Sequence, residues 1–218
     1  MADFTFALML SIARKICEAD GNTKKEKWVK LIGSEVYGKT LGVIGGGSIG
    51  KSVIARARGF GMDILVYDIK KDKELTEKFN AKYVDLKYLL KNSDFVTIHV
   101  PLNKTTKGLI GKKELEFMKK SSYLINTARG GVVDEKDLYE ALKTGKIAGA
   151  ALDVFCKEPP RESPLLELKN LTATPHIAAY TRSSLETLDI ISAENVISVL
   201  KGFRPLEIYV VNKEIFSD

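Results

Sequence analysis

The chain has 218 residues, 44% of them hydrophobic, with a formal net charge of +6, which predicts one large globular domain with an ample core. It lacks a membrane-length apolar run and a signal-peptide pattern, and its lysines are scattered among acids, so composition argues against membrane and nucleic-acid partners. The spacing of Cys17 and Cys156 predicts neither a disulfide nor a metal site, which favours a cytoplasmic protein with no bound metal.

The first predicted element is a helix over residues 4–18. Phe4, Leu8 and Ile12 recur at helical spacing, whereas Phe6 widens the apolar surface beyond one stripe. Such a helix needs more than one covering surface. It is either a core helix of its own domain or, as we favour because it precedes the first strand, a helix partly buried against a second subunit.

Residues 20–35 are polar and charged around a single tryptophan, Trp28, and are interpreted as a connecting arm. Trp28, Leu31 and Ile32 are the expected anchors of this arm. The arm either wraps around its own domain or embraces a partner. Taken with the preceding helix, residues 4–35 predict the contact of a homodimer.

A dinucleotide-binding pattern follows. A short apolar run at 41–44 predicts a buried parallel strand, and three glycines then lead into a helix that begins near Ser48. Gly45 permits the tight turn, Gly47 lets backbone N–H groups approach a pyrophosphate, and Gly50 lets the helix pack close to the strand. The partial positive charge at the N-terminus of that helix favours phosphate groups.

A second apolar run at 64–67 ends in Asp68. A carboxylate at this point can accept hydrogen bonds from both hydroxyls of an adenosine ribose, and it would repel a 2′-phosphate. The sequence therefore predicts binding of NAD rather than NADP. A glycine turn with only a structural role is the less favoured alternative, because strand, glycines, helix, second strand and acid occur in the required order.

The remaining sequence alternates between strand and helix patterns. Strands are predicted at 83–84, 94–101, 122–127, 147–154 and 171–174, a helix or loop at 70–81, and helices at 86–91, 113–119, 135–144 and 184–201. This alternation predicts an α/β protein with a Rossmann-type, doubly wound parallel sheet covered on both faces.

Three polar residues follow three successive predicted strands: Arg129, Glu158 and His176. The carboxyl ends of neighbouring parallel strands share one crevice, so these side chains are expected to converge near the nicotinamide. Arg129 would clamp a carboxylate and polarise a carbonyl, His176 would move a proton, and Glu158 would fix the tautomer of His176. Taken singly, they could equally be a surface arginine, a loop charge and a capping histidine. His99, the other histidine, is expected to pack or hydrogen-bond locally.

Three segments carry a specific resemblance: NTARGGVVDE at 126–135, GAALDVFCKEP at 149–159 and TPHIAA at 174–179. They resemble the signatures of the D-isomer-specific 2-hydroxyacid dehydrogenases, in the order of that family. The resemblance implies that Arg129 binds the substrate carboxylate, that His176 is the acid/base and Glu158 its partner, that Asp153 contacts the carboxamide of NAD, and that residues 4–35 form the dimer contact.

The glycine pattern and the resemblance together predict the cofactor site. Its expected residues are Gly45, Gly47, Ser48, Ile49, Gly50, Asp68, Val100, Pro101, Thr127, Ala128, Arg129, Asp153, His176, Ala178 and Ala179. Ser48 departs from the family, which very often has arginine there, so the pyrophosphate would rely more on backbone N–H groups. The implied substrate is a small anionic D-2-hydroxy or 2-oxo acid, with 3-phosphoglycerate as one candidate.

Family members carry a substrate domain ahead of the first helix, and this sequence begins at that helix. We therefore expect an NAD-binding domain over residues 1–201 and a tail over 202–218 that would return to the absent domain. The alternative function is a non-catalytic NAD-binding dimerisation module. Formate dehydrogenase, a further possibility within the fold, would be expected to carry glutamine at position 158 instead of glutamate.

Overall fold

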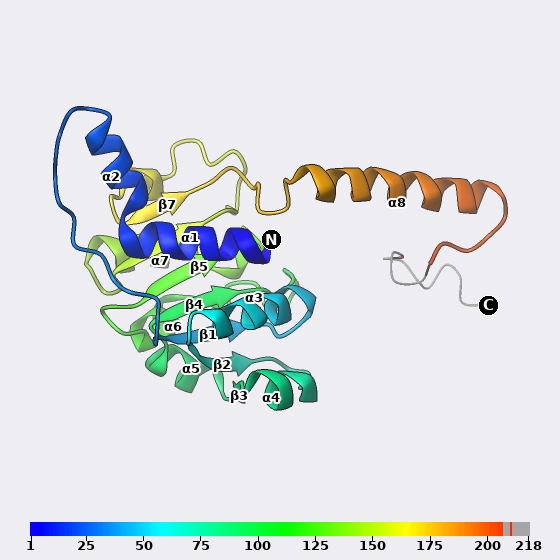
Figure 1. The fold of residues 1–218 in the computed structure, drawn as a ribbon, viewed down its shortest axis with the longest axis horizontal. Coiled ribbons are helices and arrows are strands. Elements are labelled where there is room, and N and C mark those ends of the chain that lie inside the picture. Colours follow the sequence, from blue (N-terminus) through cyan, green and yellow to red (C-terminus); the bar gives the residue numbers. More distant parts are fainter. Residues whose placement is uncertain (207–209, 211–218) are drawn as a thin grey trace. The chain divides into compact units, whose positions relative to one another are not determined.

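The computed structural model describes residues 1–206 and 210, and its central feature is a seven-stranded, wholly parallel sheet in the order β3-β2-β1-β4-β5-β6-β7 (Figure 1). The strands are β1 Thr40–Ile44, β2 Asp63–Tyr67, β3 Lys82–Tyr83, β4 Phe95–Ile98, β5 Tyr123–Asn126, β6 Gly149–Leu152 and β7 Leu171–Ala173. The order reverses between β1 and β4, which creates the crevice where ligands bind in doubly wound folds. The predicted fold class is confirmed.

Among the described residues, α-helices connect the successive strands from β1 to β6, and further helices precede β1 and follow β7. They are α1 Ala2–Arg14, α2 Ile16–Thr23, α3 Ser48–Gly59, α4 Lys73–Phe79, α5 Leu86–Asn92, α6 Lys112–Phe117, α7 Glu135–Lys143 and α8 Arg182–Leu200, with short 3₁₀ turns at Gly130–Val132 and Pro164–Glu167. Side-chain oxygens of Asp72, Asp85, Asp134 and Thr181 accept backbone N–H groups at the starts of α4, α5, α7 and α8. Caps of this kind contribute about 1 kcal/mol each.

Two apolar layers cover the sheet, one on each face. On one face α1 and α3 pack on the strands, and Phe6 stacks on Phe60 with ring centroids 5.1 Å apart. On the other face α5, α6 and α7 contribute buried leucines such as Leu89, Leu115 and Leu138. Burial on both faces explains why the central strands read as continuous apolar runs.

The chain divides into two compact units, residues 1–178 and 179–218. The first contains the sheet, and the second contains α8, which ends before Gly202 in the left-handed conformation (φ 78°). The domain expected over 1–201 stays a prediction. Most of the predicted tail at 202–218 lies outside the described residues. No helix in the described ranges is long and apolar enough to cross a membrane.

The first helix differs from the prediction. Its expected range, 4–18, is interrupted at Lys15, which adopts a left-handed conformation (φ 55°) and closes α1 through its N–H group. The chain then continues as α2, so the first part of the expected arm is helical. Trp28 and Ile32 are 85% and 89% exposed, so neither anchors the arm to its own domain. The predicted dimer contact remains a proposal.

Candidate cofactor and active site

The glycine turn between β1 and α3 lies at the point where the strand order reverses. Gly45 has φ 98°, and a Cβ atom there would lie 2.7 Å from the carbonyl oxygen of His99. A Cβ on Gly50 would lie 1.9 Å from the carbonyl oxygen of Gly45, so both positions require glycine. By contrast, the space around Gly47 is open to 4 Å.

That open space lies at the N-terminus of a twelve-residue helix. Among the described residues, no side chain caps α3 at Gly47. The first N–H groups of a helix need partners, and the partial positive charge there favours an anion. The turn at Gly47, Ser48 and Ile49 therefore fits a pyrophosphate held by backbone N–H groups. This agrees with the expectation from position 48, where serine stands in place of the arginine that the family very often has.

Asp68 follows β2 and is half-buried beside this turn. Its Oδ2 accepts a hydrogen bond from the N–H group of Gly46 at 2.6 Å, and its Oδ1 accepts one from the N–H group of Lys70 at 2.9 Å. Each carboxylate oxygen has a further lone pair, so the group can still accept from ribose hydroxyls. The contacts to the chain fix the carboxylate in place, a detail the sequence pattern did not reveal.

His99 directly follows β4 and precedes Val100 and Pro101. Its Nε2 lies 2.9 Å from Oγ1 of Thr97, and burial lowers the pKa of its imidazole to about 4. The contact with Thr97 confirms the expectation that His99 hydrogen-bonds locally. Val100 is half-buried, whereas Pro101 is exposed at the edge of the same crevice.

Glu158 and His176 come together from the loops after β6 and β7. Oε2 of Glu158 lies 2.7 Å from Nδ1 of His176, and the two side chains are 37% and 47% exposed. Oε1 of Glu158 accepts a hydrogen bond from the N–H group of Phe155 at 3.0 Å. Burial raises the pKa of Glu158, but the hydrogen bonds from His176 and Phe155, with the charges of His176 and Arg129, outweigh it and leave that pKa lowered.

Asp153 holds the turn that carries His176. Its buried Oδ1 accepts hydrogen bonds from the hydroxyl of Thr174 (2.6 Å) and the N–H group of Ile177 (2.9 Å), and its Oδ2 accepts from the N–H group of Ala178 (2.8 Å). His176 itself is in a left-handed conformation, with φ 56°. Asp153 is therefore an organiser of the loop. Its contact to a carboxamide stays a prediction and would use the remaining acceptor capacity of the carboxylate.

Arg129 lies on the loop after β5, which Asn126 shapes. The amide of Asn126 accepts from the N–H group of Ala128 and donates to the carbonyl of Arg129, both at 3.0 Å. The guanidinium is exposed and donates to the carbonyl of Ala128 at 2.6 Å. The positive charge of Arg129 therefore acts on the carboxylate of Glu158, while its guanidinium remains accessible to an anionic ligand.

Two contacts join the loops after β5 and β6. A Cβ on Gly130 would lie 2.0 Å from the carbonyl carbon of Phe155, so the two backbones touch. Glu135, the first residue of α7, accepts the N–H group of Cys156 at 2.5 Å. Burial and the charge of Glu135 raise the pKa of the Cys156 thiol to about 11. Gly130 and Glu135 lie in the segment 126–135, but the sequence pattern assigned them no role, because each contacts a residue more than twenty positions away.

The remaining expected positions are placed by their elements. Thr127 is buried at the end of β5, and its Oγ1 lies 3.1 Å from Oγ1 of Thr5 on α1. Ala178 is buried at the end of the first unit, and Ala179 begins the second. Among the described residues, no group of three histidine, cysteine, aspartate or glutamate side chains could hold a metal ion.

A glycine turn at the reversal of a parallel sheet, with an acid after β2, defines a Rossmann-type dinucleotide-binding domain. Residues 6–178 match the D-isomer specific 2-hydroxyacid dehydrogenase, NAD binding domain, and the chain belongs to this family.

Similar proteins carry related names. The chain is 47% identical over 205 residues to a D-3-phosphoglycerate dehydrogenase of Methanocaldococcus jannaschii, covering 93% of this chain and 39% of that protein. It is 44% identical over 221 residues to a glyoxylate reductase of Korarchaeum cryptofilum, covering 98% and 66%. A D-lactate dehydrogenase of Aquifex aeolicus, solved with NAD and lactic acid, superposes with a TM-score of 0.86 at 38% identity, covering 92% and 66%. The chain thus spans between 39% and 66% of the length of these proteins.

Proposed function

We propose that this chain provides the NAD site and the acid/base machinery of an oxidoreductase that interconverts a D-2-hydroxy acid and its 2-oxo acid. The observation that carries the proposal is the 2.7 Å contact between Glu158 and His176, with the charge of Arg129 acting on the same carboxylate. The relatives named above act, by their names, on phosphoglycerate, glyoxylate and lactate. All three compounds carry a carboxylate next to a hydroxyl or carbonyl carbon.

Each residue has a separate task in this proposal. Arg129 binds the substrate carboxylate and orients the neighbouring oxygen. Because Nδ1 of His176 is engaged by Glu158, Nε2 is the nitrogen that exchanges a proton with the substrate oxygen. Glu158 holds the imidazole in that tautomer and stabilises its protonated form. NAD, when bound, supplies the hydride acceptor and, in its reduced form, the hydride donor.

The cofactor would lie along the glycine turn. Backbone N–H groups around Gly47 and Ser48 hold the pyrophosphate, and Asp68 accepts the ribose hydroxyls and disfavours a 2′-phosphate. In this proposal Val100, Thr127 and Asp153, which follow the neighbouring strands β4, β5 and β6, contact the cofactor at the carboxyl edge of the sheet.

The substrate and assembly are further parts of the proposal. 3-Phosphoglycerate remains one candidate substrate among small anionic 2-hydroxy acids. The exposed Trp28 and Ile32 favour a homodimer through residues 4–35, because large apolar side chains on an extended arm gain by burial against a partner.

The test is the loss of NADH absorbance by the purified chain with 3-phosphohydroxypyruvate, hydroxypyruvate, glyoxylate or pyruvate. We expect turnover that His176→Ala abolishes and that Lys157→Ala, an exposed position in the same loop, retains. Binding of NADH, followed by fluorescence, should persist in both variants. Turnover unaffected by His176→Ala would contradict the assigned acid/base. Binding of NADH without turnover would favour the non-catalytic NAD-binding dimerisation module.

A further inference from the structure

The segment between Asp68 and α4 is held at both ends. At one end Asp68 accepts N–H groups from Gly46 and Lys70. At the other end the N–H group of Asp72 donates to the hydroxyl of Tyr83 at 2.8 Å, and Oδ1 of Asp72 accepts the N–H group of Glu74 at 2.9 Å. Only three residues separate the two held positions, so the placement of Asp72 constrains that of Asp68.

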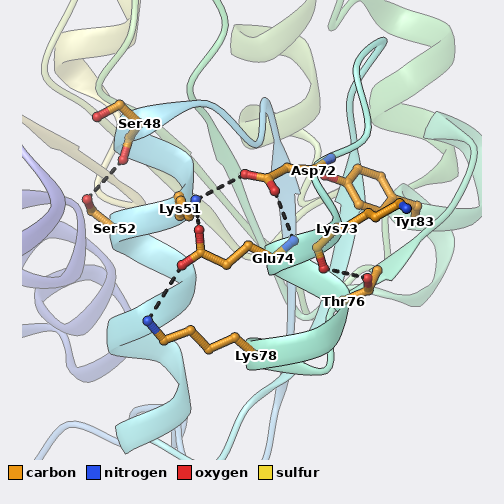
Figure 2. Close-up of polar contacts among 9 residues, drawn as sticks. All are labelled: Ser48, Lys51, Ser52, Asp72, Lys73, Glu74, Thr76, Lys78 and Tyr83. Carbon is orange, nitrogen blue, oxygen red and sulfur yellow. Dashed lines mark hydrogen bonds and ion pairs between the residues drawn. The ribbon is translucent and has the colours of Figure 1, made fainter.

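Lys51 links this segment to the helix that follows the glycine turn. It lies in the first part of α3, and its Nζ lies 3.0 Å from Oδ2 of Asp72 and pairs also with Oε2 of Glu74 (Figure 2). Hydrogen bonds to Glu74 and Asp72 raise the pKa of Lys51, and the same bonds lower the pKa values of the two acids. All three groups therefore stay charged at neutral pH.

The start of α4 also touches the glycine turn directly. A Cβ on Gly46 would lie 2.9 Å from Cδ1 of Leu75 and 3.5 Å from the hydroxyl oxygen of Tyr83. Leu75 is fully buried, so α4 packs against the backbone whose N–H group binds Asp68. A displacement of α4 would alter both the Gly46 turn and the segment after Asp68.

We propose that Lys51 is a positioning residue for cofactor discrimination. By pairing with Asp72 and Glu74 it holds α4 and residues 68–72 against α3, and so fixes the carboxylate of Asp68 where it meets the ribose hydroxyls. A fixed anion rejects a 2′-phosphate more strongly than one that can swing away. The inference rests on the role proposed above for Asp68.

A simple charge effect of Lys51 leads to the opposite expectation. If the ammonium acted only by attracting an anionic cofactor, its removal would weaken binding of NADPH more than binding of NADH, because NADPH carries the additional phosphate. The ratio Kd(NADPH)/Kd(NADH) would then rise. In the positioning role the ratio falls, so the direction of the change separates the two effects.

The experiment measures the Kd of NADH and of NADPH by fluorescence for the full chain and its variants. In Lys51→Met the ratio Kd(NADPH)/Kd(NADH) is expected to fall by about threefold to tenfold, in the lower part of the range of couplings within a charge network. Lys51→Arg, which keeps the charge and the donors, is expected to restore the ratio. Lys78→Met is the matched control: Lys78 contacts Glu74 at 3.5 Å from further along α4, and its loss should change the ratio less than about twofold.

An unchanged or increased ratio in Lys51→Met, or an equal fall in Lys78→Met, would overturn the inference. If Lys51→Met does not fold, Glu74→Gln removes one of the two ion pairs, and a fall in its ratio is again required. Asp68→Ala separates this inference from the proposed function. If the wild-type chain shows no preference for NADH, or Asp68→Ala leaves the preference intact, the role of Asp68 fails. If Asp68→Ala abolishes the preference and Lys51→Met does not alter it, only the role of Lys51 fails.

Discussion

Nδ1 of His176 and Oε2 of Glu158 lie 2.7 Å apart, although the two residues belong to loops that follow different strands. Each loop has its own support. The N–H group of Phe155 holds the second oxygen of Glu158, and Asp153 holds the turn around His176. Hydrogen bonds within the chain thus orient the pair.

Glu158→Gln tests the electrostatic part of this pair. The amide preserves the size of the side chain but loses the charge that stabilises a protonated His176, so we expect kcat to fall by about a hundredfold or more. Kd for NADH should be unchanged, because Glu158 lies outside the glycine turn. A variant with full kcat would contradict the assigned role, whereas weaker NADH binding would indicate a broader structural effect.

Gly130→Ala tests the contact between the loops after β5 and β6. The added Cβ would lie 2.0 Å from the carbonyl carbon of Phe155, so one loop must move. We expect a loss of about 2 kcal/mol in the free energy of unfolding, measured by urea denaturation, from the overpacked contact.

Gly21→Ala is the control for that substitution. Gly21 lies within α2, where a Cβ meets nothing within 4 Å, so alanine should leave stability unchanged or raise it by up to about 1 kcal/mol. Equal effects of the two substitutions would contradict the close approach at Gly130.

His99 predicts a pH dependence of stability. Its pKa is about 4 in the folded chain against an ordinary value of 6.5, so the unfolded state binds the proton more readily. The contribution of His99 to the free energy of unfolding is therefore fully present above pH 6.5 and is lost as the pH falls toward 4. Between pH 7 and pH 5 this group should reduce the free energy of unfolding by about 2 kcal/mol.

The measurement compares denaturant unfolding of the wild-type chain and His99→Gln at the two pH values. On acidification the variant should lose less of its free energy of unfolding than the wild-type chain does, by that amount, because it has no imidazole at position 99 to protonate. An identical loss in both proteins would mean that the imidazole of His99 is not the source of the pH dependence. Only His99 and His176 are present, so ring resonances in NMR can be assigned with two variants.

The arm predicts an effect on assembly. Trp28→Ser combined with Ile32→Ser removes the two exposed apolar side chains that are proposed to be buried against a partner. We therefore expect a shift from dimer to monomer in sedimentation. Tyr88→Ser, another exposed aromatic position, should leave the mass unchanged. This design leaves α1 intact, which matters because Leu8 and Met9 are buried in its own domain. A dimer that persists in the double variant would contradict the arm contact.

The sequence predicted the parts of the fold that depend on local patterns. Apolar runs marked the buried strands, and the glycines at 45 and 50 marked a turn that the structure shows to be sterically closed to other residues. The approach of Glu158 to His176 could be anticipated because parallel strands end at one edge.

Other features depend on contacts that no local pattern encodes. The break at Lys15 occurs inside an unbroken helical pattern, and it separates α1, which has seven buried residues, from α2, which has none. Asp153 was expected only as a ligand for the cofactor, yet it accepts three hydrogen bonds from the turn around His176. The bond from Cys156 to Glu135 joins residues 21 positions apart, and only the folded geometry reveals it.

The hydroxyls of Thr5 and Thr127 meet 3.1 Å apart in a buried position, where the first turn of α1 touches the end of β5. Arg129 follows two residues later, and α1 leads through Lys15 into α2 and the arm. A single helix and one hydrogen bond therefore connect the arm to the loop that carries Arg129. A tilt of α1 would reach this loop through Thr5, and it would reach α3, the helix after the glycine turn, through the stacked rings of Phe6 and Phe60.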